Sequence, residues 1–408
     1  MLAALRPSNP RAALTDENQA LVPPQLFALR CALAYAATVA VNGVILPYFP
    51  VWLQSLSFSS DEIGIVLAAQ MVLRVAAAPF AGMIADRLPE RSSMLAWSAT
   101  LSLATAFALF ATHTFWPVLI VFGLQAAVFA PYPPIVESIT VTGVRRWGFQ
   151  YGRMRVWGSI GFVAATLAVG ALIGIWGAGL VPTALAAAFL LTLAVAFAAP
   201  RLGAPRGLPP DASAAAAWQR APVHLHVLMA GAALIQASHG MYYAFSTLYW
   251  RQAGFSSGMV GVLWSTGVLA EIMVFLFSGW IARRVAPGTL MRWGCAAAVL
   301  RWALFPLPLG LWGTLCLQLM HALTFALVHL GLQHRLVESV REDQEASVQG
   351  AYVFYGGAFL GLSTLASGWL YHQFGGLGFL GMSVIGLAGL ATVVLALRLQ
   401  PQRAASGG

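Results

Sequence analysis

Charged side chains are scarce in this sequence, and lysine is absent. Only 9% of the 408 residues are charged, whereas 59% are hydrophobic. A soluble globular domain carries about 25% charged residues, so the composition excludes that class and predicts a multi-pass membrane protein. The three cysteines all lie inside apolar runs, where a thiol usually acts as a small apolar filler. We therefore expect no disulfide.

Motifs that would indicate an enzyme are also missing. The chain has no P-loop, no H-E-x-x-H pair, no nucleophile elbow and no cysteine cluster. His321 and His329 are eight residues apart, or about 12 Å along a helix, too far to share one metal ion. The sequence thus predicts no enzyme, no cofactor and no metal site.

Apolar runs of about 20 residues, enough to cross a bilayer as helix, recur along the whole chain. They begin near residues 27, 61, 93, 116, 153, 180, 224, 257, 288, 311, 346 and 375. The expected fold is an all-α membrane protein with twelve transmembrane helices in two six-helix, pseudo-symmetric halves.

An internal repeat supports the two halves. Residues match at an offset of 197 positions, in the pairs Phe58 and Phe255, Gly43 and Gly240, Gly64 and Gly261, Phe80 and Phe277, Gly82 and Gly279, and Ile84 and Ile281. The same register places Arg74 opposite Glu271, in the middle of two equivalent helices. Parallel repeats with ionisable groups near mid-depth are typical of transporters whose halves move around a central site.

The arginines predict the orientation of the chain. They fall mainly in every second loop and near the termini, so by the positive-inside rule both termini are cytoplasmic, and the net charge of +9 does not indicate nucleic-acid binding. The expected segments are a cytoplasmic tail (1–25), a first half (26–199), a cytoplasmic linker (200–221), a second half (222–399) and a cytoplasmic tail (400–408).

Ionisable side chains inside the expected spans are candidate functional residues, because each costs at least about 2.5–3.5 kcal/mol at mid-membrane. The charged ones are Arg74, Glu137, Arg155, Glu271 and Arg301, and the histidines are His239, His321 and His329. Any one Arg–Glu pair could merely neutralise itself between helices. Three arginines against two carboxylates, however, leave one positive charge that a bound anion would balance.

The fourth expected span contains three prolines, Pro131, Pro133 and Pro134. Proline removes a backbone donor and bends a helix. A packing kink and a hinge beside a cavity both remain open interpretations.

The loop after the second span resembles the loop signature of the major facilitator superfamily. It reads Gly82-Met83-Ile84-Ala85-Asp86-Arg87 and then departs from the family pattern with Pro89 and Glu90. The resemblance implies that Gly82, Asp86 and Arg87 form a conformational latch.

A second resemblance is to lactose permease and related sugar–proton symporters. Glu137 and Arg155, with Phe162 seven residues further on, match the positions that hold and stack on the sugar in that family. Glu271 corresponds to its eighth-helix carboxylate, and Arg301 and His321 to an arginine and a histidine of the ninth and tenth helices. Thr324 stands where those symporters carry the glutamate that exchanges the proton.

The phenylpropionate permease branch of the superfamily is more similar, over essentially the whole chain. Shared features are Y-G-R-x-R-x-W-G-S at residues 151–159, Arg74, Glu271 and L-x-H-A-L-T-F at residues 319–325. The resemblance implies a permease for an aromatic acid such as 3-phenylpropionate.

These observations predict a proton-coupled symporter of a small aromatic monocarboxylate, working by alternating access as a monomer in a bacterial inner membrane. Arg155 or Arg301 would bind the carboxylate bidentately. The other expected substrate contacts are Glu137, Phe162, Trp157, His321 and Tyr355.

Proton coupling is assigned first to Glu271, then to Glu137 and His321, with Arg74 nearby. The alternatives are a sugar or nucleoside symporter, or a drug or metabolite efflux carrier; a non-transporting sensor lacks an appended signalling domain.

Overall fold

The computed structural model describes residues 22–87, 90–202, 222–339 and 345–399. Side chains are described within these ranges except at 78–87, 91, 337 and 345–347. All regular structure in the described ranges is helical. Eight helical stretches of the described chain are long and apolar enough to cross a membrane.

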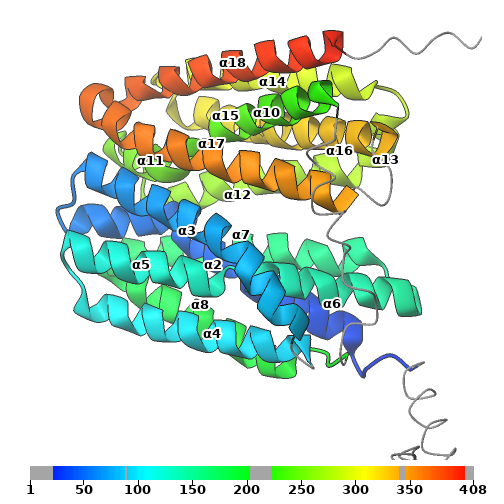
Figure 1. Ribbon diagram of the computed structural model, residues 1–408. Coiled ribbons are helices and arrows are strands. Elements are labelled where there is room, and N and C mark those ends of the chain that lie inside the picture. Colours follow the sequence, from blue (N-terminus) through cyan, green and yellow to red (C-terminus); the bar gives the residue numbers. More distant parts are fainter. Residues whose placement is uncertain (1–21, 88–89, 203–221, 340–344, 400–408) are drawn as a thin grey trace, which may run out of the picture.

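The helices before residue 203 form one group, called here the first group, drawn from blue to green in Figure 1. They are α2 (Phe27–Ser55), α3 (Ser60–Arg87), α4 (Arg91–Ala108), α5 (Phe115–Phe129), α6 (Tyr132–Trp147), α7 (Tyr151–Trp176) and α8 (Val181–Ala198). Short 3-10 turns, η1 (Leu109–Ala111) and η2 (Ala178–Leu180), follow α4 and precede α8.

The helices after residue 221 form the second group, drawn from green to red in Figure 1. They are α10 (Val223–Ala237), α11 (Gly240–Gln252), α12 (Ser257–Leu276), α13 (Ser278–Ala282), α14 (Pro287–Leu304), α15 (Gly310–Ala322), α16 (Val328–Ser339), α17 (Glu345–Phe374) and α18 (Phe379–Arg398). A π-helical turn, η4 (Leu323–Leu327), joins α15 to α16, and a 3-10 turn, η6 (Gly375–Gly378), precedes α18.

The prolines of the fourth expected span interrupt it, as predicted. Helix α5 ends at Phe129, and α6 begins at Tyr132, directly after Pro131. Pro133 and Pro134 lie in the first turn of α6, where backbone N–H groups have no partner within the helix. The interruption therefore leaves the hydrogen-bond ladder of α6 intact.

Besides the break at Phe277 between α12 and α13, helices of the second group are interrupted between α10 and α11 and at η4. Between α10 and α11, the Ser238 hydroxyl donates to the Ile235 carbonyl at 2.6 Å, and His239 Nδ1 lies 2.9 Å from the same oxygen. Side chains thus satisfy a carbonyl at the helix end. The second interruption is η4, where an extra residue is accommodated in a π turn; such turns are frequent at functional sites.

The two groups meet along α3 with α17, α7 with α12, and α2 with α11. We call the end of the bundle that carries the α2–α3 turn the closed end. There, a Cβ atom on Gly64 would lie 2.8 Å from the Cα atom of Gly368, so the backbones of α3 and α17 touch. One turn further toward this end, His372 Nδ1 lies within hydrogen-bonding distance of Asp61 Oδ2.

Candidate functional site

Arg301 lies on α14 at the centre of the second group and is completely buried. Its Nη1 atom is 3.1 Å from Nδ1 of His321 and 3.4 Å from Oγ1 of Thr324. Its Nη2 atom donates to Oε1 of Gln318 at 3.3 Å. None of these three partners is a carboxylate. The positive charge of the guanidinium is therefore stabilised mainly by the dipoles of an imidazole, a hydroxyl and an amide.

Two aromatic rings complete the enclosure of Arg301. Its Cζ atom lies 4.8 Å from the ring centroid of Tyr242 and 4.5 Å from that of Trp302. A desolvated cation over an aromatic face gains about 2 kcal/mol or more. The Tyr242 hydroxyl also donates to Gln318 Oε1 at 3.0 Å. Arg301 is therefore fixed in a packed network with no open path to a ligand.

The hydrogen bonds determine which ring nitrogen of each histidine carries a proton when the ring is neutral. Arginine can only donate, so Nδ1 of His321 accepts and its Nε2 carries the hydrogen. That Nε2 atom faces Oε2 of Glu271 at 3.7 Å. For His239, Nδ1 donates to the Ile235 carbonyl, and Nε2, 3.0 Å from Thr324 Oγ1, accepts from the hydroxyl. His321 thus presents a donor to the carboxylate of Glu271.

Glu271 lies on α12 where the second group faces the first. Its side chain is 23% exposed, and its only ion-pair contact among the described residues is the long one to His321. Arg155 lies on α7, the helix of the first group against which α12 packs. A carboxylate of one group and an arginine of the other therefore lie on helices that meet across the boundary between the groups.

Arg155 is exposed, in contrast to Arg301. Its Cζ atom lies 5.3 Å from the ring centroid of Tyr35 on α2. The Tyr35 hydroxyl donates to Oε2 of Glu137 on α6 at 2.6 Å. Tyr35 thus lies between Arg155 and Glu137: its ring packs against the guanidinium, and its hydroxyl donates to the carboxylate.

Aromatic side chains from both groups meet about two helical turns from Arg155 and Glu271. The rings of Phe162, on α7, and Trp264, on α12, have centroids 6.4 Å apart. Trp264 also packs against Tyr242 and Tyr243 on α11, at 4.6 and 6.3 Å. Of these residues, only Phe162 was among those predicted from the sequence; Tyr35, Trp264, Tyr243 and Gln318 were not. The adjacent tyrosines beside His239 were a signal that could have indicated this aromatic wall.

Two of the expected substrate contacts lie elsewhere. Trp157 is exposed and lines a separate groove with Leu29 and Arg153. It stands two residues from Arg155, or about 200° around the helix, and so points away from it. Tyr355, on α17, has its hydroxyl 3.2 Å from Nδ1 of His226 on α10, and none of its described contacts involves Arg155 or Glu271.

Arg74 is exposed and makes no hydrogen bond or ion pair with another described residue. One helical turn before it, Gln70 lines a cavity of about 20 Å³ that also includes Met71, Tyr243 and Thr364. Arg74 shares this face of α3, where the two groups meet. It forms no pair with Glu271 within the described residues.

The latch residues Gly82, Asp86 and Arg87 lie in the last turns of α3, but their side chains are outside the described part of the molecule. In the described residues, no group of three or more His, Cys, Asp or Glu side chains could hold a metal ion.

Comparison with known proteins identifies the family. Residues 29–380 match the MFS_1 like family. A protein of Escherichia coli (strain K12) described as "Probable 3-phenylpropionic acid transporter" is 28% identical over 355 residues, which cover 84% of this chain and 91% of that protein. A lactose permease of Citrobacter freundii is 28% identical over 132 residues, 30% of this chain and 31% of the permease.

Solved structures agree with the architecture. A crystal structure of the nucleoside transporter NupG matches with a TM-score of 0.79 and 16% sequence identity, over 92% of this chain and 100% of that chain. At this identity the likeness shows the fold alone. Because the family match spans most of the chain, the protein belongs to the MFS_1 like family and is a multi-pass membrane transporter of the major facilitator type.

Proposed function

We propose that this protein is a proton-coupled symporter of a small aromatic monocarboxylate such as 3-phenylpropionate. Twelve transmembrane helices, six in each group, would enclose one central site in a bacterial inner membrane, with both termini cytoplasmic. The similarity to the phenylpropionic acid transporter of Escherichia coli supports the substrate class. The placement of Arg155 and Glu271 on α7 and α12, which pack against each other across the two groups, carries the proposal.

Arg155 is the residue that we assign to the substrate carboxylate. It is exposed, lies over the ring of Tyr35, and makes no hydrogen bond or ion pair with another described residue, so its planar fork is available for bidentate binding. Arg301, the other sequence-based candidate, is buried, and both of its terminal nitrogens already have partners. Arg301 is instead proposed to position His321.

Coupling follows from competition for Arg155. In the empty carrier, this arginine favours the ionised form of Glu271. A bound substrate carboxylate neutralises Arg155, and Glu271 is left in an apolar boundary without its counter-charge. Neutralising Glu271 with a proton then favours movement through the membrane, so substrate and proton travel together. His321 Nε2–H would orient the carboxylate during the exchange.

The aromatic part of the substrate would contact rings from both groups. Phe162 and Trp264 approach each other about two helical turns from Arg155 and Glu271, and Tyr35 adds a ring next to the guanidinium. Such a wall favours an aromatic ring over an aliphatic chain, because ring pairs add about 0.5–1.5 kcal/mol to area burial.

The direct contacts at the closed end fit one state of an alternating-access cycle. With cytoplasmic termini, the closed end faces outward, and the exposed Arg155 and Arg74 would be reached from the cytoplasm. We propose that the described conformation faces inward. The latch of Asp86 and Arg87 would then act at the opposite end when the carrier faces outward.

A sugar or a nucleoside is the second candidate substrate. The hydrogen bond between Tyr35 and Glu137 favours it, because a carboxylate and a phenol beside an arginine could bind hydroxyl groups. The partial similarity to lactose permease points the same way. Efflux of a drug or metabolite remains an alternative direction of transport.

The external pH distinguishes these functions. We would add 3-phenylpropionate, and separately a galactoside, to de-energised, lightly buffered cells that overproduce the protein, after correction for passive entry of the acid. Alkalinisation with the aromatic acid alone is the expected result, and it should be absent in the Glu271→Gln variant. A response to the galactoside alone would show that the substrate is a sugar rather than an aromatic acid. No response to either compound would contradict proton-coupled uptake of both.

A further inference from the structure

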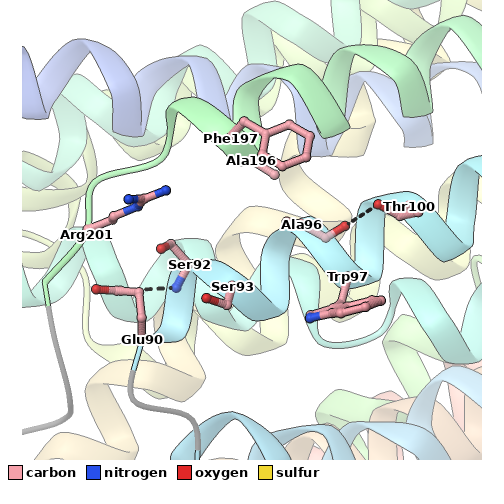
Figure 2. Close-up of a pocket in the computed structure, with 9 residues that line it drawn as sticks. All are labelled: Glu90, Ser92, Ser93, Ala96, Trp97, Thr100, Ala196, Phe197 and Arg201. Atoms are coloured by element: carbon pink, nitrogen blue, oxygen red, sulfur yellow. Dashed lines mark hydrogen bonds between the residues drawn. The ribbon is translucent and has the colours of Figure 1, made fainter.

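A groove of about 660 Å³ lies between the start of α4 and the end of α8 (Figure 2). Its lining residues are Glu90, Ser92, Ser93, Ala96, Trp97, Thr100, Ala196, Phe197 and Arg201. Helices α4 and α8 lie on the side of the first group that faces away from the second group (Figure 1). Both belong to stretches apolar enough to span a membrane, Ser92–Ala111 and Ala178–Ala198. The groove therefore opens toward lipid, at the level where these spans end.

The polar part of the groove offers donors without partners. Arg201 is exposed and makes no hydrogen bond or ion pair with another described residue. The hydroxyls of Ser92 and Ser93 likewise make no hydrogen bond within the described residues. In Figure 2, the Arg201 guanidinium and the Ser92 side chain lie on facing sides of the gap between the end of α8 and the start of α4. A guanidinium fork beside a hydroxyl suits the oxygens of a phosphate group.

The other part of the groove is apolar. The side chains of Trp97 and Phe197 are 65% and 68% exposed. Thr100 donates its hydroxyl to the Ala96 carbonyl at 2.8 Å, as Figure 2 shows. Its hydroxyl is therefore already satisfied within α4. Tryptophan is enriched where membrane meets water, so Trp97 indicates the depth of a headgroup and the first carbons of an acyl chain.

Glu90 restricts the charge of the ligand. Its Oε1 atom accepts from the backbone N–H groups of Ser92 and Leu202, at 3.3 and 3.4 Å, and so ties the start of α4 to the chain after α8. A carboxylate in the wall disfavours a doubly charged free phosphate. A phosphodiester carries one negative charge, so the carboxylate of Glu90 repels it less than a doubly charged phosphate.

We propose that this groove binds the phosphodiester headgroup of an anionic phospholipid. Arg201 and Ser92 hold the phosphate, and Trp97 and Phe197 contact the acyl chain. The site is separate from the substrate site, and its occupancy joins α4 to α8 at one end of the first group.

Native mass spectrometry of the full chain, titrated with phosphatidylglycerol after release from detergent, tests the proposal. Arg201→Gln should weaken the tightest lipid adduct at least about tenfold, because a hydrogen bond to a charged group contributes about 1.5–3 kcal/mol. The matched control is Arg283→Gln, which removes the same charge from an exposed position after α13. Unchanged affinity in Arg201→Gln, or equal weakening in both variants, would overturn the site.

A competition experiment separates a lipid from a soluble phosphate. Glycerol phosphate at a large molar excess should not displace the lipid adduct, and Trp97→Ala should weaken it severalfold. Efficient displacement by glycerol phosphate would show that the polar part alone makes the site and would contradict the lipid assignment. Unaltered thermal unfolding of the lipid-free variants verifies that each still folds.

Discussion

Arg155 and Arg301 occupy the same bundle in opposite environments. Arg155 is exposed and touches one aromatic ring, whereas Arg301 is buried beneath two rings and bonded at both terminal nitrogens. An arginine without fixed partners can exchange them during a transport cycle. One that is buried, with both terminal nitrogens bonded, holds its neighbours in place. The comparison thus separates a ligand-binding cation from a structural one, although both lie in apolar helices.

The largest effect is expected from Arg155→Gln. Removing the cation should reduce affinity for 3-phenylpropionate by about a hundredfold, within the range of 2–5 kcal/mol found for truncated charge pairs. The measurement is binding of the labelled acid to purified protein. Folding should remain intact because the side chain is exposed. Retention of affinity would show that Arg155 does not bind the substrate carboxylate, and the proposed difference in role between Arg155 and Arg301 would be wrong.

Glu271→Gln should uncouple the carrier without abolishing binding. Glutamine imitates the protonated acid, so accumulation driven by a pH gradient should vanish, whereas exchange of labelled for unlabelled substrate across vesicles should continue. Counterflow and accumulation assays on the same vesicles measure both. Glu137→Gln is the matched control, since Glu137 is held by Tyr35. Full accumulation of substrate in Glu271→Gln would show that a residue other than Glu271 carries the coupled proton.

Arg301→Lys should act on stability more than on binding. Lysine keeps the charge but cannot reach His321, Gln318 and Thr324 together, and each buried partner left unpaired costs about 1–3 kcal/mol. Thermal unfolding in detergent should shift to lower temperature. The opposite pattern, intact stability with severely weakened binding of the acid, would make Arg301 the carboxylate ligand, as the sequence analysis allowed.

The smallest effects sharpen the position of the aromatic wall. Phe162→Leu should weaken binding of 3-phenylpropionate about five- to tenfold, in line with the 0.5–1.5 kcal/mol of an aromatic pair. Trp157→Leu, on the other face of α7, should change it less than twofold. Titration of both variants with the labelled acid compares them directly. A larger loss of affinity from Trp157→Leu would place the ligand on the face of α7 that carries Trp157 and would contradict the proposed site.

Much of the architecture could be predicted from the sequence because bilayer thickness fixes the length of apolar runs. The helical character and the interruption at Pro131 followed from such rules. The sequence predicted a span beginning near residue 288, although Arg292 and Arg301 lower the hydropathy of α14 below that of the eight stretches apolar enough to cross a membrane. The interruptions at His239 and at Leu323–Leu327 were not predicted, since no proline or glycine pair marks them.

The candidate site was predictable in its charges but not in its contacts. The repeat placed Arg74 opposite Glu271, yet the described structure shows no pair between them. Helical spacing alone could have shown that Trp157 and Arg155 point to different faces of α7, because they are two residues apart. Whether an arginine is buried or exposed depends on the neighbouring helices, as Arg301 and Arg155 show, and no local pattern carries that information.

The glycine contact at the closed end bears on the speed of transport. Where Gly64 meets Gly368, two bare backbones touch with no side chains interlocked between them. Parting the groups there requires no rotamer to change and leaves no void to refill. We expect the activation barrier for opening at this contact to come mainly from breaking the hydrogen bond between His372 and Asp61 rather than from the packing of the two helices.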